Sequence, residues 1–175
     1  MINPIENGLT LDEHGIQMPW YTRPALEVMD KWDLKGKMVF EYGVGYSSLW
    51  YLSRGAQTFG VDSNKEWTEI SCTGLVANDQ ERYVCAIDIA ATASILVDGQ
   101  LFDLVIIDGL YRDECTKYAL KNLKTGGKLI LDNWLQPTVE PEWPKTKELI
   151  KGLPIELYYE PGHWDNWCTA IVTKI

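Results

Sequence analysis

The chain has 175 residues, a formal net charge of −9, and a composition that is 46% hydrophobic and 23% charged. This balance is typical of a soluble globular protein, and we expect residues 1–175 to form a single domain. The acidic charge disfavours nucleic acid as a partner, and the lack of a long apolar run or a leader-like N-terminus predicts a cytoplasmic protein that does not enter a membrane.

The first 33 residues are predicted to be an irregular stretch followed by a helix. Pro24 favours a helix start, and Leu26 and Met29 give this helix one apolar face. Trp20 and Tyr21 stand just before it in an apolar cluster. Aromatic side chains in such a place commonly pack down onto the core.

The most informative stretch lies between residues 38 and 67, where a strand, a glycine turn, a helix and a second strand are predicted. The first strand ends in Glu41, and Gly43 and Gly45 let the backbone turn sharply and approach a ligand closely. Ser47 is predicted to cap the helix, so that free N–H groups at its start face the same crevice. The glycines alone are equally consistent with a purely structural turn.

Asp62 ends the second strand, 19 residues after Gly43. A carboxylate at this place can accept hydrogen bonds from both hydroxyls of a ribose. The third glycine of a dinucleotide-binding fingerprint is missing, because Ser48 stands there. Acids at the ends of two successive strands nevertheless favour a cofactor that contains a nucleoside.

Strands and helices continue to alternate after residue 63. Residues 102–107 give the clearest strand, because a continuous apolar run of this length indicates burial on both faces of a parallel sheet. Asn64 and Asp88 are candidate N-caps for the helices that follow them, and residues 125–127 are expected to form a turn. The last two strands have no helix between them and are therefore antiparallel. Strands are expected at about 82–87, 102–107, 128–131, 155–159 and 168–173, and helices at about 90–97, 112–123 and 145–151.

Acidic side chains follow five of the predicted strands, which is more than helix capping requires. These residues are Glu41, Asp62, Asp88, Asp108 and Asp132, with Asn133 directly after the last. In open α/β sheets, ligands bind beyond the carboxyl ends of the strands. The pattern therefore indicates a polar ligand site along one edge of the sheet.

The stretch Glu41-Tyr42-Gly43-Val44-Gly45, followed by Asp62, resembles the first two motifs of the class I S-adenosylmethionine-dependent methyltransferases. The resemblance implies an α/β fold with a doubly wound, mostly parallel seven-stranded sheet in the order 3-2-1-4-5-7-6, with strand 7 antiparallel and helices on both faces. It also implies S-adenosylmethionine as the cofactor. The expected cofactor-binding residues are Glu41, Gly43, Gly45, Tyr46, Ser47, Asp62, Asp88 and Asp108.

The same resemblance implies that the N-terminal segment, residues 1–33, includes a lid over the cofactor. Trp20 and Tyr21 are then expected in the substrate pocket, together with Asn133 and Trp134. The chain is too short to carry a separate substrate domain. We therefore expect a small-molecule or sugar acceptor, methylated at oxygen.

Asp108, Asp132 and Asn133 also resemble the metal-binding set of the catechol-type O-methyltransferases. If a metal is bound, these three are its expected ligands, because two carboxylates and an amide oxygen suit Mg²⁺. That family has a lysine base shortly after the first acid, whereas this chain reads Gly109-Leu110-Tyr111-Arg112. Asp108 and His163 are therefore the candidate catalytic residues. In the alternative, Asp108 contacts the methionine end of the cofactor, and the Asp132-Asn133 pair orients substrate or caps a loop.

Two other functions fit the same glycine turn and strand-end acids. A nicotinamide-dependent reductase would share both features, although the sequence holds no Tyr-x-x-x-Lys pair. A non-catalytic module that binds S-adenosylmethionine is the other alternative, because a fold does not determine a function.

Overall fold

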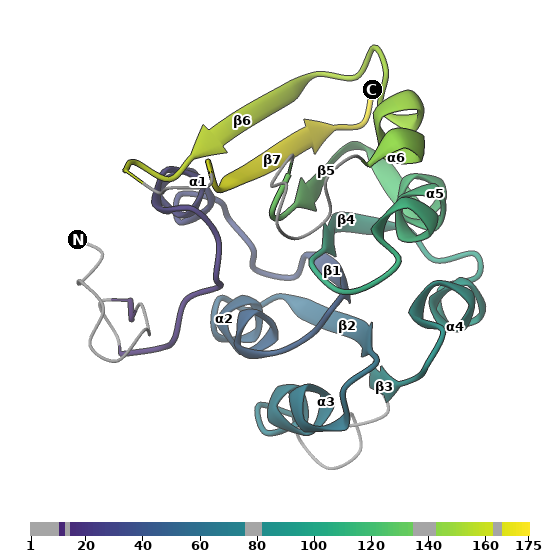
Figure 1. Cartoon of the computed structure of the whole chain (residues 1–175). Coiled ribbons are helices and arrows are strands. Elements are labelled where there is room, and N and C mark those ends of the chain that lie inside the picture. The colour runs from purple at the N-terminus through teal and green to yellow at the C-terminus, as the bar shows by residue number, and fades with distance from the viewer. Residues whose placement is uncertain (1–10, 13–14, 76–81, 135–142, 163–165) are drawn as a thin grey trace.

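The computed structural model describes residues 11–12, 15–75, 82–134, 143–162 and 166–175. A seven-stranded sheet crosses the molecule, with helices on both of its faces (Figure 1). The strands are β1 (Met38–Tyr42), β2 (Gln57–Asp62), β3 (Tyr83–Cys85), β4 (Phe102–Ile107), β5 (Leu123–Leu131), β6 (Ile155–Tyr159) and β7 (Cys168–Thr173). The helices are α1 (Arg23–Met29), α2 (Tyr46–Ser53), α3 (Lys65–Cys72), α4 (Ile89–Leu96), α5 (Arg112–Asn122) and α6 (Pro144–Leu149).

The strand order is β3-β2-β1-β4-β5-β7-β6. Strands β1 to β5 are parallel, and β7 is antiparallel to both of its neighbours. The fold class, strand order and strand directions predicted from the sequence are thus confirmed. In the centre, β1 and β4 pair from Val39 with Leu104 to Tyr42 with Ile107. The segments that follow these two strands therefore begin side by side at the same edge of the sheet.

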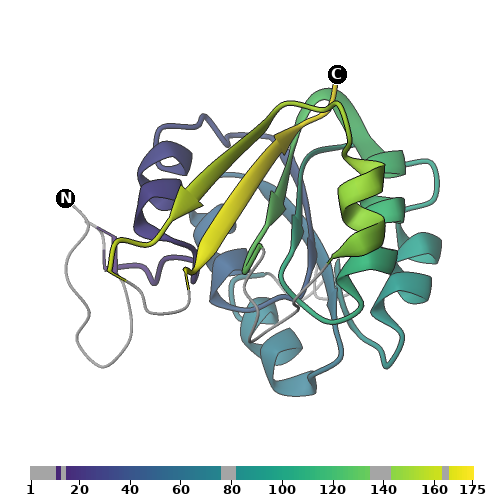
Figure 2. The ribbon, with the colours of Figure 1, turned by 45° about the horizontal axis from the view of Figure 1, so that its top comes forward.

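Two apolar cores cover the two faces of the sheet. One core lies against α4, α5 and α6, and the other against α1 and α2. These two groups of helices lie on opposite faces of the sheet (Figure 2). In β4, Val105 and Ile107 belong to the first core, whereas Leu104 and Ile106 belong to the second. Successive strand side chains point to opposite faces, so burial of both faces explains the continuous apolar run of this strand.

Two strands differ in length from the prediction. β5 begins at Leu123 rather than near residue 128, because Leu123 pairs with Phe102 ahead of an irregularity in the β4–β5 register. The Gly126-Gly127 pair, which the sequence placed in a turn, therefore lies within β5. β3 is limited to Tyr83–Cys85.

Of the three helix N-caps predicted from the sequence, one differs from the structure and two agree with it. α2 begins at Tyr46 with Gly45 as its N-cap, so the prediction that Ser47 caps this helix was wrong. Asn64 accepts the backbone N–H of Glu66 at the start of α3, as predicted. Asp88 likewise accepts the backbone N–H of Ala91 at 2.9 Å, which confirms it as the N-cap of α4.

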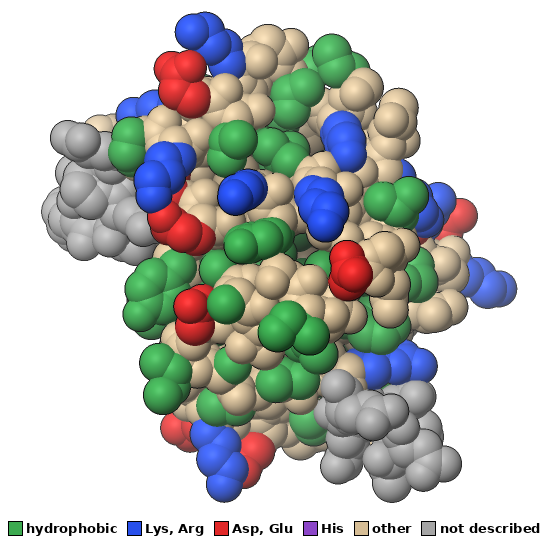
Figure 3. Space-filling view, turned by 90° about the vertical axis from the view of Figure 1, so that its right-hand side faces the viewer, with side chains coloured by type: hydrophobic (Ala, Val, Ile, Leu, Met, Phe, Trp, Pro, Cys, Tyr) green, Lys and Arg blue, Asp and Glu red, His purple; other side chains and the backbone are tan. Residues whose placement is uncertain are grey.

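Part of the apolar surface is exposed on and beside α4. The exposed side chains there are Ile87, Ile95, Leu96 and Leu101. Hydrophobic side chains gather over the lower half of the face shown in Figure 3, and some exposed apolar surface is normal for soluble proteins. Among the described residues, none of the helices is both long enough and apolar enough to cross a membrane.

Candidate functional site

A cavity of about 270 Å³ lies at the carboxyl ends of β1, β2 and β4. Its walls come from the N-terminal segment, the β1–α2 turn, the ends of β2 and β4, and α3. The lining residues are Gln17, Met18, Trp20, Gly43, Val44, Gly45, Tyr46, Ser47, Asp62, Trp67 and Asp108. The structure therefore brings together seven of the predicted site residues, which are Trp20, Gly43, Gly45, Tyr46, Ser47, Asp62 and Asp108.

Gly43 holds the β1–α2 turn against the loop that follows β4. Its φ is +93°, and a Cβ built there would lie 2.4 Å from the backbone nitrogen of Gly109. The N–H of Gly109 in turn donates to the carbonyl of Tyr42 at 2.8 Å. The sequence assigned this glycine to close approach of a ligand, whereas the contact that excludes a side chain here is with the neighbouring loop.

Asp62 is anchored by two backbone N–H groups at the edge of the cavity. Its Oδ2 accepts the N–H of Val44 at 3.0 Å, and its Oδ1 accepts the N–H of Asn64 at 2.7 Å. The side chain is therefore fixed to the turn and to the start of α3 at once. Each carboxylate oxygen has more than one acceptor site, so Asp62 can still accept hydrogen bonds from a ligand in the cavity.

Glu41 lies behind the turn and is fully buried. Ser47 donates its hydroxyl to Oε1 at 2.7 Å, and Ser48 donates to Oε2. Burial raises the pKa of Glu41 to about 8, although the two serine hydroxyls act in the opposite direction. Among the described residues Glu41 is not part of the cavity lining, so any effect on a ligand passes through the turn that it holds.

Two further residues predicted to bind the cofactor, Tyr46 and Asp88, lie at the starts of α2 and α4. Tyr46 is about one-third exposed and packs edge-on against Trp67, with 6.0 Å between the ring centroids. Asp88 is exposed and is engaged as the cap of α4. It does not belong to the described lining of the cavity.

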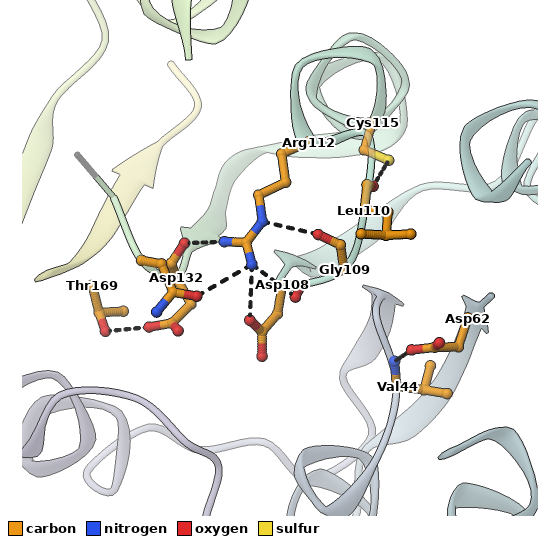
Figure 4. Close-up of polar contacts among 10 residues, drawn as sticks. Val44, Asp62, Asp108, Gly109, Leu110, Arg112, Cys115, Asp132 and Thr169 are labelled. Carbon is orange, nitrogen blue, oxygen red and sulfur yellow. Dashed lines mark hydrogen bonds and ion pairs between the residues drawn. The ribbon is translucent and has the colours of Figure 1, made fainter. Parts of the chain in front are cut away.

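Arg112, at the start of α5, connects the ends of β4 and β5 (Figure 4). Its Nε donates to the carbonyl of Gly109 at 2.9 Å, and its Nη1 donates to the carbonyl of Asp132. Its Nη2 donates to the carbonyl of Asp108 at 3.0 Å and to Oδ1 of Asn133 at 3.2 Å. Sequence reasoning treated this arginine only as a helix start, because most of its partners are backbone carbonyls.

The Asp108 carboxyl group faces the cavity with the guanidinium beside it. Its Oδ1 lies 3.5 Å from Nη2 of Arg112. Burial raises the pKa of Asp108 above its usual range, Arg112 opposes that shift, and the nearby Asp62 adds to it. The carboxyl group of Asp108 therefore changes between its protonated and ionised forms at a pH that is closer to neutrality than for an exposed aspartate.

Asp132 and Asn133 do not present a metal site with Asp108. Asp132 is 2% exposed and accepts the hydroxyl of Thr169 at 2.8 Å, and burial raises its pKa well above the usual range. The amide oxygen of Asn133 is taken up by Arg112. Within the described part of the chain, no group of three or more His, Cys, Asp or Glu side chains is arranged to hold a metal ion. In this arrangement, Asp108, Asp132 and Asn133 therefore do not form a binding site for Mg²⁺.

The predicted pocket aromatics separate into exposed and buried side chains. Trp20 is 59% exposed and lines the cavity. Tyr21 is packed in the core, where the hydroxyl of Tyr51 donates to the hydroxyl of Tyr21 at 3.4 Å. Trp134 is also buried and packs against Trp143, with ring centroids 5.3 Å apart. Tyr21 and Trp134 are therefore placed as core residues, and His163 lies outside the described residues.

No family model and no curated protein sequence matches the chain. Solved structures do match it. An O-methyltransferase from Bacillus cereus in complex with SAH is 18% identical with a TM-score of 0.60, over 79% of this chain and 74% of that one. A putative caffeoyl-CoA O-methyltransferase from Staphylococcus aureus is 17% identical with a TM-score of 0.63, over 89% and 86%. An rRNA methylase from Streptococcus thermophilus is 14% identical with a TM-score of 0.63, over 90% and 99%.

These matches show that the chain has the fold of the class I S-adenosylmethionine-dependent methyltransferases. The fold that the resemblance implies is therefore confirmed. The matched proteins differ in the acceptor that their names give, so the likeness defines an architecture and not a substrate.

Proposed function

We propose that this protein is an S-adenosylmethionine-dependent methyltransferase that acts at an oxygen atom of a small-molecule or sugar acceptor. The observation that carries the proposal is the cavity, in which the glycine turn, Asp62 and Asp108 meet beyond the carboxyl ends of three adjacent strands. Open α/β folds bind their ligands at this edge. When bound, the cofactor supplies an electrophilic methyl group attached to a positively charged sulfur.

The roles of the cavity residues follow from their chemistry. We assign Asp62 the role of accepting hydrogen bonds from ribose hydroxyls; the two backbone N–H groups that orient its carboxylate support this assignment. Gly45, Tyr46 and Ser47 would contact the cofactor through the turn and the start of α2. Asp88 is proposed as the acceptor for the adenine amino group, because its carboxylate has further acceptor sites besides the one that caps α4. Glu41 would act indirectly, by fixing Ser47.

Asp108 is the proposed general base. A hydroxyl acceptor must lose its proton, and a carboxylate whose pKa is raised toward neutrality removes protons more effectively than an ordinary one. Asp108 lines the cavity, so a bound acceptor can reach it. His163 is kept as a second candidate for this role.

The N-terminal segment is proposed to act as a lid within a single domain that spans residues 1–175. Gln17, Met18 and Trp20 already form one wall of the cavity. The exposed indole of Trp20 offers an apolar surface to an acceptor or to the cofactor. A cytoplasmic location is proposed from the sequence alone.

RNA is the competing acceptor, because one of the matched structures is an rRNA methylase. The net charge of −9 argues against it, since binding to a phosphate backbone depends on positive charge. A reductase and a non-catalytic binding module are the remaining alternatives.

Calorimetric titration separates these functions. We expect S-adenosylmethionine and S-adenosylhomocysteine (SAH) to bind and NADH not to bind. Replacement of Asp62 by alanine should weaken SAH binding by about tenfold or more, since each charge-assisted hydrogen bond contributes about 1.5–3 kcal/mol. Asp98→Ala is the matched control, because Asp98 is an exposed acid that pairs with Lys121 on the surface.

NADH binding in place of SAH would identify a reductase and overturn the proposal. Equal SAH affinity of Asp62→Ala and Asp98→Ala would remove the ribose assignment. SAH binding without methyl transfer to hydroxyl acceptors, tested as a panel of catechols, phenols and sugars, would favour the binding module.

A further inference from the structure

Arg112 is surrounded by oxygen atoms in the part of the site where the resemblance placed a metal. Its guanidinium contacts the carbonyls of Asp108, Gly109 and Asp132 and the amide oxygen of Asn133, and it forms an ion pair with the Asp108 carboxylate. Only 5% of Arg112 is exposed. On one side its Cζ lies 5.3 Å from the ring centre of Trp143, so the cation is enclosed by oxygens and an aromatic face.

The backbone around Arg112 is shaped for this arrangement. Four non-glycine residues in the described chain have positive φ, and three of them adjoin the guanidinium: Tyr111, Asn133 and Trp143. Tyr111 directly precedes Arg112, Asn133 supplies an oxygen, and Trp143 supplies the ring. Left-handed backbone is unfavourable for bulky residues such as tyrosine and tryptophan, although asparagine adopts it more readily, and it persists where the surrounding structure requires it. The two aromatic residues in this conformation beside one side chain indicate that the fold is organised to hold the cation there.

We propose that the guanidinium of Arg112 takes the place of a divalent cation at the ends of β4 and β5. Two of the three expected metal ligands, Asp108 and Asn133, contact the guanidinium through their side chains, and the third, Asp132, contacts it through its carbonyl. A fixed positive charge at this position neutralises the strand-end acids and repels a second cation. The site therefore binds no Mg²⁺ or Mn²⁺ while Arg112 is present.

The proposal concerns the occupant of the site and does not require the protein to transfer methyl groups. Its consequence for catalysis rests on the proposed function: methyl transfer by this chain would proceed in the presence of a chelator. A failure of methyl transfer would leave the cation-binding experiment interpretable, so the two proposals can fail separately.

Titration with Mn²⁺, followed by the electron paramagnetic resonance signal of the free ion, tests the proposal on the full chain. We expect the wild-type protein and the Asn133→Ala variant to bind Mn²⁺ equally. Any Mn²⁺ that both proteins bind lies elsewhere on the acidic surface, and this result agrees with the proposal. A stoichiometric Mn²⁺ site that is lost in Asn133→Ala would overturn it.

Removal of the guanidinium provides the second arm. Arg112→Met keeps a long side chain but leaves the oxygens without a cation, and carboxylate, amide and carbonyl oxygens are ligands that Mn²⁺ accepts. We expect this variant to bind Mn²⁺ at least about tenfold more tightly than the wild type, and Asp108→Asn in the same background to abolish the gain. Unchanged Mn²⁺ affinity in a folded Arg112→Met protein would show that Arg112 does not occupy a cation site. If that variant does not fold, the wild-type titration decides.

Discussion

Glu41 is a carboxylic acid enclosed by protein on all sides, and its protonation links stability to pH. The folded-state pKa is raised from 4.5 to about 8 by burial. The folded protein therefore holds a proton that the unfolded chain releases above pH 4.5. Stability from this group is fully present below that value and is lost as the pH rises toward about 8, by up to about 1.4 kcal/mol for each pH unit.

We therefore expect Glu41→Gln to remove this part of the pH dependence. The melting temperatures of the variant and the wild type should be similar near pH 5 and should diverge toward pH 8, where the variant becomes the more stable protein. Thermal unfolding followed by circular dichroism across this range provides the measurement. Parallel curves for the two proteins would mean that Glu41 does not carry the raised pKa.

Gly43 and Gly109 meet backbone to backbone, and this contact leaves no space for a side chain. Gly43→Ala should destabilise the fold by roughly 2–5 kcal/mol, because left-handed strain and overpacking add together. Gly99→Ala is the matched control, since Gly99 also has a positive φ of +76° but a Cβ added there would meet nothing within 4 Å. Urea unfolding of both variants isolates the contact. An equal loss in the free energy of unfolding of the two variants would mean that the two loops move apart without strain.

The residues of the candidate site were predictable where strand ends and glycine turns mark them. Asp62 and Asp108 were placed correctly at one edge of the sheet because parallel strands bring their carboxyl ends together. Arg112 was missed as a site residue because its partners are mostly backbone carbonyls, which leave no pattern in the sequence. Ser47 was assigned to a cap, since the sequence does not reveal that a buried carboxyl group takes its hydroxyl.

Among the elements, the N-terminal segment precedes the sheet in the chain and forms one wall of the cavity. Trp20→Ala should weaken SAH binding by about tenfold, or ~1.4 kcal/mol, through loss of aromatic contact. Because Trp20 is 59% exposed, the melting temperature should change little. Ile95→Ala on α4 is the control, with a side chain that is exposed and remote from the cavity lining. Unchanged SAH affinity in Trp20→Ala would remove the lid assignment.

Strand prediction succeeded where hydrophobic runs are continuous and was less accurate where pairing depends on a distant strand. Residues 102–107 matched β4 because burial on both faces requires an unbroken apolar run. The early start of β5 could not be predicted, because it depends on the pairing of Leu123 with Phe102 across an irregular register. Glycines at positions 126 and 127 indicate a turn when the partner strand is unknown.

At the scale of the whole molecule, the acidic charge makes a prediction about RNA. A net charge of −9 should prevent stable binding to a phosphate backbone. In a gel-shift assay with a ribosomal RNA fragment, we expect no complex at protein concentrations of about 10⁻⁶ M, the tighter end of ordinary non-specific binding. A complex that weakens steeply as salt is added would instead favour RNA as the acceptor.

The pairing of β1 with β4 also has a consequence for synthesis on the ribosome. A hydrogen bond from Met38 to Asp103 joins residues that are 65 positions apart. At about 5–20 residues per second, β1 is made roughly 3–13 s before the strand that will lie beside it. During this interval the β1–α2 turn exists without the loop that carries Asp108 and Gly109. A ligand of the cavity can therefore begin to stabilise the nascent chain only after β4 has left the exit tunnel.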